Sequence, residues 1–140
     1  MEITVSFPGG KRVDAEVGGF TIRTDQPIDH GGEASAPEPF ALFLASLATC
    51  AGLYVLAFCR TRAIPTDQIR LIERTESDPK SGRLLHVELE VRVPPGFPAE
   101  YHDAVARAAS ACKIKKTLAD PPRIDVTTRV DDSPSTAHAA

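Results

Sequence analysis

The sequence lacks the features that would assign it to several broad classes of protein. Its 16 lysines and arginines are outnumbered by 19 aspartates and glutamates, which gives a net charge of -3. Because binding a phosphate backbone requires a basic excess, we expect no nucleic-acid partner. Neither GxGxxG nor GKS/T occurs, so the nucleotide-binding signatures are missing as well. With 42% apolar and 25% charged residues in 140, the chain is predicted to form one soluble globular domain.

Cysteine is scarce, and its three positions do not form a secreted disulfide framework. The number is odd and there is no CxxC. The chain starts Met1-Glu2-Ile3-Thr4, without a basic stretch before an apolar run, so we expect no signal peptide and a cytoplasmic location. In a reducing compartment a thiol is either an inert core residue or a reactive group. The positions of Cys50, Cys59 and Cys112 are therefore the main question.

Periodicity and turn signals predict an α+β fold. Strands are grouped in runs instead of alternating regularly with helices, which favours antiparallel sheet over a doubly wound fold. We expect residues 1–130 to form the domain and 131–140 to be a disordered C-terminal tail. The predicted strands are 2–7, 12–17, 20–23, 68–76, 85–93 and 124–130; the predicted helices are 40–58 and 99–112, with a basic turn at 113–118.

The longest apolar run, 40–58, contains no charged residue and meets the length rule for a membrane span. Ser46, Thr49, Gly52 and Tyr54 interrupt it, and the rest of the chain supplies amphipathic strands and a helix that need a partner to cover. A helix that is apolar on all sides can equally be the central helix of a domain. We therefore expect a buried helix and no membrane insertion.

The cysteines divide by position along this helix. Cys59 lies nine residues after Cys50, about half a turn away at roughly 100° per residue, so the two face opposite sides and cannot pair. Cys112 ends a core-facing stripe of the second helix, and a meeting of Cys50 with Cys112 is sterically allowed if the helices pack. Buried free cysteine is most often a small hydrophobe, so filling is the competing interpretation.

Other polar groups are weaker candidates. His30 and Glu33 lie on the loop before the apolar run, and His86 is predicted on the solvent face of its strand. A zinc site would need Cys50 and Cys112 together with histidines from among His30, His86 and His102. None of these residues has metal-ligand spacing to another. We expect no metal and no cofactor. Lys113, Lys115 and Lys116 could favour a thiolate at Cys112, or form an ordinary solvated turn.

Three stretches resemble the OsmC/Ohr family of thiol-dependent peroxidases. They are Gly31-Gly32-Glu33, the run from Ala36-Pro37-Glu38-Pro39 through Ala48-Thr49-Cys50, and Ala111-Cys112-Lys113-Ile114-Lys115-Lys116-Thr117-Leu118 with Pro121-Pro122. The resemblance extends from about Glu2 to Val130. It implies an OsmC-like fold in which antiparallel sheet wraps a long central apolar helix, and an intertwined homodimer with two sites at the interface.

The resemblance also implies a chemistry. Cys50 would be the peroxidatic thiolate that attacks an alkyl or lipid hydroperoxide, and Cys112 would resolve it to a disulfide that an external dithiol reduces. In the family, an arginine from the N-terminal strands, held by a glutamate early in the central helix, stabilises the thiolate. Here Phe40 and Ala41 stand where that glutamate would fall.

Substitute residues for this polar pair can be named from the sequence. Glu38 is the nearest carboxylate to the missing position, and Arg12 is the best arginine, with Arg23 next. This departure keeps a second hypothesis open: a non-catalytic OsmC-like module that binds an apolar small molecule at the dimer interface.

Overall fold

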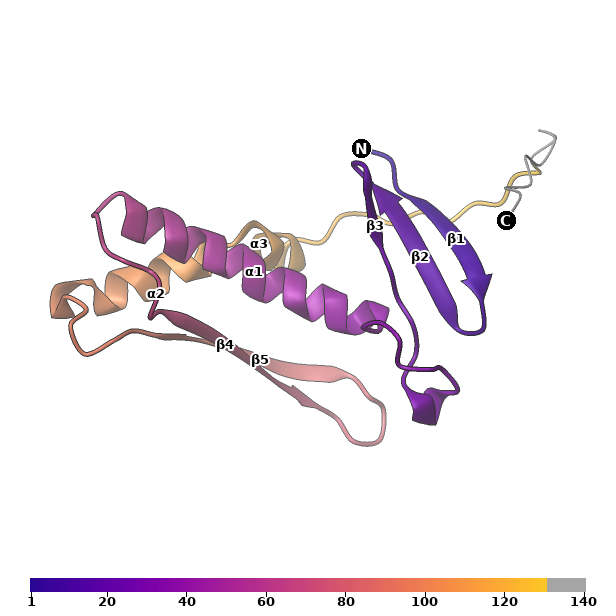
Figure 1. The fold of residues 1–140 in the computed structure, drawn as a ribbon, viewed down its shortest axis with the longest axis horizontal. Helices are drawn as coiled ribbons and strands as arrows, with labels where there is room; N and C mark the ends of the chain where they lie inside the picture. Colours follow the sequence, from indigo (N-terminus) through magenta and orange to yellow (C-terminus); the bar gives the residue numbers. More distant parts are fainter. Residues whose placement is uncertain (131–140) are drawn as a thin grey trace.

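The computed structural model describes residues 1–130, and the expected tail at 131–140 lies outside them. The chain forms two antiparallel sheets and a long helix followed by shorter ones (Figure 1). The first sheet has the order β1-β2-β3 and the second is the hairpin β4-β5. In chain order, the elements are β1 (Thr4–Gly9), β2 (Arg12–Val17), β3 (Phe20–Ile22), η1 (Ile28–His30), α1 (Pro39–Arg60), β4 (Arg70–Ser77), β5 (Leu84–Arg92), η2 (Ala99–Tyr101), α2 (His102–Ser110) and α3 (Lys113–Ala119).

Helix α1 is the predicted apolar helix, extended by a residue or two at each end. Pro39 occupies its first turn, where the missing N–H costs nothing, and Glu38 is the N-cap. The C-terminal end is closed by Arg62, whose guanidinium stacks 3.8 Å from the centre of the Phe58 ring and donates to the Phe58 carbonyl at 3.1 Å. The cation therefore meets the negative pole of the helix, as its position in the sequence predicts.

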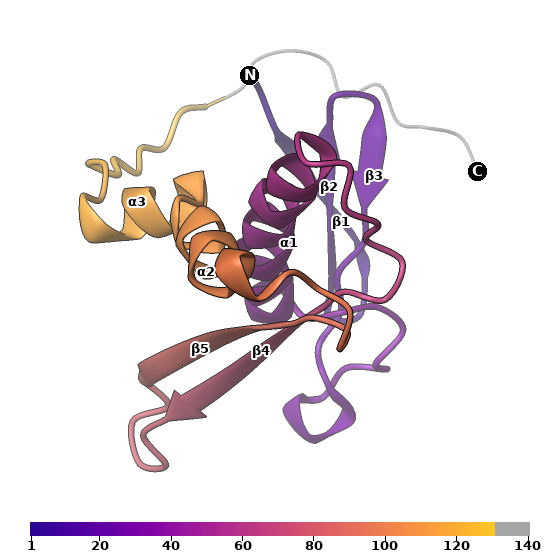
Figure 2. The same cartoon turned by 90° about the vertical axis from the view of Figure 1, so that its left-hand side faces the viewer.

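The core lies along one side of α1. Its residues on that side are spaced by four, and α2 packs against them (Figure 2). The buried residues of the core are Leu47, Ala51, Val55, Cys59, Phe97, Val105, Ala109 and Cys112. Most other residues of α1 are half-buried, and Phe40 and Leu53 are exposed. Helix α1 is long and apolar enough to cross a membrane, and 22% of its most apolar window is buried.

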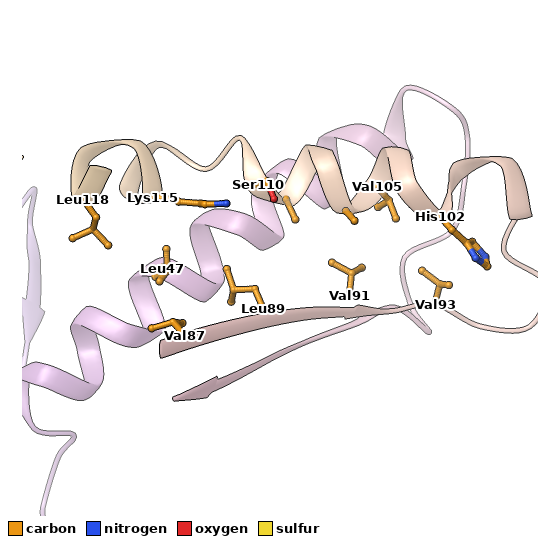
Figure 3. A pocket seen from close by; sticks show the side chains of 12 residues that line it. Leu47, Val87, Leu89, Val91, Val93, His102, Val105, Ser110, Lys115 and Leu118 are labelled. Carbon is orange, nitrogen blue, oxygen red and sulfur yellow. The ribbon is translucent and has the colours of Figure 1, made fainter. Parts of the chain in front are cut away.

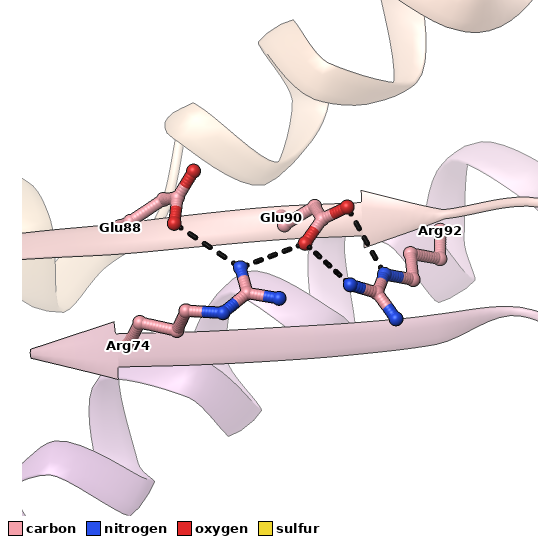
Figure 4. Close-up of polar contacts among 4 residues, drawn as sticks. All are labelled: Arg74, Glu88, Glu90 and Arg92. Carbon is pink, nitrogen blue, oxygen red and sulfur yellow. Dashed lines mark hydrogen bonds and ion pairs between the residues drawn. The ribbon is translucent and has the colours of Figure 1, made fainter.

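Strand β5 follows the alternation predicted for 85–93, with Val87, Leu89 and Val91 partly buried against the core. The outer face of the hairpin β4-β5 carries an ion-pair network in which Arg74 lies 3.1 Å from Glu88 and 2.8 Å from Glu90, and Arg92 lies 3.0 Å from Glu90 (Figure 4). Hydrogen bonds from Arg92 and Arg74 lower the pKa of Glu90 to about 2. His86 is exposed, as predicted for this face.

Three expectations about the fold need correction. Residues 113–118, predicted as a turn, belong to helix α3, in which Ile114 and Leu118 are spaced by four. The predicted strand 124–130 is exposed chain without a ladder partner among residues 1–130. The helix predicted over 99–112 consists of η2 and α2 and ends at Ser110, so that Cys112 lies in the turn after it. The α+β class with antiparallel sheets and a long apolar helix is confirmed, and the three-stranded sheet lies beyond the N-terminal end of α1, apart from the hairpin (Figure 1).

Candidate functional site

The structure brings Cys50 and Cys112 together from elements 62 positions apart in the sequence. Cys50 is half-buried on α1, and Cys112 is fully buried in the turn between α2 and α3. The Cys112 sulfur lies 3.9 Å from the carbonyl oxygen of Leu47, one turn before Cys50 on the same helix. The two thiols lie close enough to affect each other's pKa.

The turn that positions Cys112 is short and made of small residues. Helix α2 ends at Ser110, the Cys112 amide donates to the Ala109 carbonyl at 3.3 Å, and Cys112 is itself the N-cap of α3. The first amides of α3 therefore point toward the thiol pair. Because the first N–H groups of a helix have no partner within it, they are available to hydrogen-bond a thiolate.

The two thiols differ in acidity. The pKa of Cys50 is lowered by the hydrogen bond from the Cys112 thiol, by the backbone amides of Ile114 and Lys113, and by the positive charge of Lys113. The pKa of Cys112 is raised by burial and by its contact with Cys50. Within the pair, Cys50 ionises first and Cys112 stays protonated.

The third thiol is separate from this pair. Cys59 lies on the buried stripe of α1 with Val55, and burial raises its pKa. The positive charge of Arg62 acts in the opposite direction and lowers the pKa of Cys59. Cys59 therefore fits the interpretation of core filling, and the expected division of three thiols into two plus one agrees with the geometry.

The polar residues proposed around the thiolate lie elsewhere in the single chain. Arg12 is exposed at the start of β2, where its guanidinium donates to the Gly9 carbonyl at 3.4 Å. Glu38 caps α1, about 18 Å along the helix axis before Cys50 at 1.5 Å per residue. Neither contributes to the lowered pKa of Cys50, which rests on Cys112 and the start of α3.

The loop before α1 is held by a buried carboxylate that sequence reasoning missed. Asp25 accepts hydrogen bonds from the backbone amides of Gln26, Glu33 and Ser35 and from the Ser35 hydroxyl, at 2.8, 3.2, 3.0 and 2.7 Å. These bonds, those of Ser35 first, lower its pKa to about 2. At Gly32 a Cβ atom would stand 1.9 Å from the Gln26 carbonyl oxygen. Gly32 and the backbone amide of Glu33 therefore maintain the conformation of the loop. His30 is exposed beside them.

An apolar groove of about 490 Å³ runs between β5 and α2 (Figure 3). Its walls are the inward-facing residues of β5 and one side of α2, and Leu47, whose carbonyl contacts Cys112, closes one part of it. Lys115 of α3 is its charged lining residue, together with the polar His102 and Ser110. Among residues 1–130, no three histidines, cysteines or carboxylates are grouped so as to hold a metal ion.

The acidity of Cys50 gives a testable dependence on Cys112. Replacing Cys112 by alanine removes the largest cause of the lowered pKa, so the pH midpoint for alkylation of Cys50 should rise and its alkylation at pH 7 should slow severalfold. The measurement is the iodoacetamide rate against pH, followed by mass spectrometry at Cys50. Cys59→Ala is the matched control and should leave the profile in place; an unchanged profile in Cys112→Ala contradicts the assignment.

The fold and the thiol pair define a small α+β protein with two adjacent cysteines of unequal acidity. A family model described as OsmC-like protein matches residues 31–127. The chain therefore belongs to the OsmC-like family. No curated protein matches it.

Solved structures with the same fold agree with this assignment. A candidate osmotic stress and detoxification response protein from Psychrobacter arcticus is 20% identical, with a TM-score of 0.71 over 82% of this chain and 85% of that one. An organic hydroperoxide resistance protein from Elizabethkingia anophelis is 18% identical, with a TM-score of 0.60 over 83% and 85%. An organic hydroperoxide resistance protein OsmC from Legionella pneumophila is 20% identical, with a TM-score of 0.53 over 84% and 87%.

Proposed function

We propose that the protein is a cysteine-based peroxidase that reduces organic hydroperoxides, with Cys50 as the attacking thiolate and Cys112 as the resolving thiol. The observation that carries the proposal is the contact between two thiols of which one has a lowered and the other a raised pKa. Membership of a family that includes organic hydroperoxide resistance proteins supports a redox role.

The proposed reaction has two steps on the protein. The Cys50 thiolate attacks the terminal oxygen of a hydroperoxide, the O–O bond breaks, and the alkoxide takes a proton to leave as the alcohol. Cys50 is now a sulfenic acid. The Cys112 sulfur attacks the Cys50 sulfur, a disulfide forms, and the hydroxyl leaves as water with the thiol proton. An external dithiol then returns two electrons, so no metal or cofactor is needed.

The surroundings favour alkyl or lipid hydroperoxides over hydrogen peroxide. Helix α1 has no charged residue before Arg60, and the apolar groove is lined by Leu47, whose carbonyl oxygen contacts the Cys112 sulfur. The burial that favours an apolar substrate also raises a thiol pKa, so the amides of Lys113 and Ile114 offset it at Cys50. The reaction would proceed in the reducing cytoplasm, where an external dithiol is available.

The working unit is proposed to be a homodimer. Most of the apolar helix α1 is only half-buried and Leu53 is exposed, and within residues 1–130 the apolar side chains of the segment 124–130 are exposed as well. A second copy would bury both without inserting α1 into a membrane. In such a dimer Arg12 of a neighbouring chain is the proposed cation for the Cys50 thiolate, with Glu38 as the proposed carboxylate. A wild-type protein that requires detergent to leave the membrane fraction would contradict this part of the proposal.

Counting free thiols tests the reaction. The reduced wild type should lose two of its three thiols on treatment with cumene hydroperoxide, and Cys59→Ser should also lose two. Cys112→Ser should lose one and accumulate a sulfenic acid that dimedone traps, because the resolving thiol is gone. The loss of one thiol in the wild type would overturn the role of Cys112, and unchanged thiols would overturn the peroxidase.

The groove favours a second candidate function, a non-catalytic module that binds an apolar small molecule. Its walls are largely aliphatic and its volume of about 490 Å³ suits a small ligand. This candidate requires a ligand that copurifies and whose binding does not depend on Cys112. Native mass spectrometry separates the two, because a protein that carries no bound mass yet consumes hydroperoxide supports the peroxidase alone.

A further inference from the structure

One carboxylate points toward the inner side of the hairpin, where the alternation provides apolar residues. Glu73 of β4 lies directly opposite Leu89 of β5 in the antiparallel register. Opposite residues of an antiparallel pair share a face, and Leu89 belongs to the residues that pack against the core. Glu73 therefore shares the face of Leu71 and Leu89, and lies away from the ion pairs of the outer face.

This carboxylate is incomplete within one chain. Its Oε2 atom is buried and has no hydrogen-bond partner among residues 1–130, and burial raises the pKa of Glu73. Helix α1 has no charged residue before Arg60, and Lys115, which lines the groove on this side of the hairpin, forms no ion pair with Glu73 within residues 1–130. A buried carboxylate oxygen without a donor is costly, so a partner from outside the described chain would stabilise it substantially.

The outer face of the same hairpin shows what a satisfied carboxylate looks like here. Glu88 and Glu90 both receive hydrogen bonds from Arg74, which neighbours Glu73 in sequence but points to the other face. The two faces of the hairpin therefore differ. The outer carboxylates of Glu88 and Glu90 are bound by Arg74 of their own chain, and within residues 1–130 no arginine binds the inner carboxylate of Glu73. A guanidinium is the group that would complete it, because its planar donors match a carboxylate.

Suitable guanidinium groups are exposed on the first sheet. Arg12 opens β2 and Arg23 directly follows β3; both are exposed, and within residues 1–130 neither forms an ion pair. The same sheet exposes Val5, Phe7 and Phe20, so its surface also lacks a partner. It lies beyond the end of α1 and does not cover its own hairpin (Figure 1). The sheet of a second copy is therefore the complementary surface.

We propose that Glu73 is an interface residue, which accepts the guanidinium of Arg23 from the first sheet of a second copy of this chain, since Arg12 is already assigned to the Cys50 thiolate. The inference rests on the homodimer of the proposed function, and it adds the ion pair that fixes how the two copies meet. By symmetry each dimer contains the pair twice. It does not depend on any step of the peroxide reaction.

The test compares Glu73→Gln with Glu76→Gln. Glutamine keeps the shape of the side chain and removes the charge, and Glu76 is an exposed residue of the same strand. Sedimentation over a concentration series should show a dimer dissociation constant at least about tenfold higher for Glu73→Gln, a loss of about 1.4 kcal/mol, and an unchanged one for Glu76→Gln. Circular dichroism establishes that each variant is folded.

Arginine variants test the same pair from the other side. Arg23→Gln or Arg23→Ala should weaken association as much as Glu73→Gln, and the double variant Glu73→Gln/Arg23→Gln should be no weaker than either single one. These substitutions leave the hairpin untouched, so they remain informative if Glu73→Gln fails to fold. A Glu73→Gln dimer as tight as the wild type or tighter, or arginine variants that both associate like the wild type, would overturn the pair. A monomeric wild type would overturn the homodimer as well, whereas a failed peroxidase assay would affect neither.

Discussion

Replacing Cys50 by serine is expected to abolish hydroperoxide reduction, with kcat/KM falling about a thousandfold or more. The hydroxyl of serine does not ionise near neutral pH, so the hydrogen bonds that lower the pKa of Cys50 have no anion to stabilise. Cys112 cannot take over the attack, because it is fully buried and its pKa is raised. The measurement is consumption of cumene hydroperoxide with a dithiol in excess.

The matched controls for this variant are the other two cysteines. Cys59→Ser should retain the wild-type rate if the variant is folded, because neither thiol of the pair affects the pKa of Cys59, which lies about half a turn from Cys50 around α1. Cys112→Ser should turn over once and then depend on direct attack of the dithiol on the Cys50 sulfenic acid. Residual turnover of Cys50→Ser above a tenth of the wild-type rate would contradict the assignment of Cys50 as the nucleophile.

The location of this chemistry on the fold follows from how α1 and α3 meet. A lone cysteine in an apolar helix would have a raised pKa, as Cys59 has. Cys50 differs because the chain returns to it at Cys112 and starts a new helix there, which brings two amides and a lysine toward its sulfur. The same turn that supplies the second thiol therefore also supplies the electrostatic support of the first.

The local pattern of the sequence predicts most elements of the fold. Alternation in 85–93 predicts β5 and the exposed His86, and the uncharged run predicts α1. The prediction fails where a short element depends on its surroundings. Ile114 and Leu118 carry a helical spacing, but it is one pair within a lysine-rich stretch, and the turn signals of the nearby prolines masked it.

The strand predicted at 124–130 fails for a different reason. Its period of two is present, but a strand exists only where another backbone offers hydrogen bonds. Within residues 1–130 that backbone is not beside it, so Ile124, Val126 and Val130 are exposed. Periodicity describes which face a residue would take and does not supply the neighbouring strand.

The candidate site could be predicted only as a possibility. Helical geometry separates Cys59 from Cys50, but the approach of Cys112 depends on how α1 and α2 pack, which the sequence allows without requiring. The backbone amides of Lys113 and Ile114 carry no signal in a pattern of side chains. The sequence does not indicate a buried Glu73 either, because Ile72 interrupts the alternation of 68–76 that would show which face Glu73 takes.

Placing a charge on the uncovered side of α1 should separate the two copies. Leu53 is 62% exposed within its own chain, although it lies in a helix without charged residues before Arg60. If this side packs against a second copy, Leu53→Glu buries a carboxylate without a partner and should weaken the dimer at least about a hundredfold, or about 2.7 kcal/mol. Light scattering after size-exclusion chromatography should then show a monomer where the wild type is dimeric.

The outer face of the hairpin provides the matched control for Leu53→Glu. His86→Glu adds the same side chain at an exposed position, next to an ion-pair network that is already solvated, and should leave the dimer intact. A Leu53→Glu protein that remains dimeric would mean that the copies meet through another surface, such as the first sheet alone. The hydroperoxide rate then shows whether the site needs its neighbour: a monomer without activity places part of the site on the second copy, and a fully active monomer confines the chemistry to Cys50, Cys112 and the start of α3.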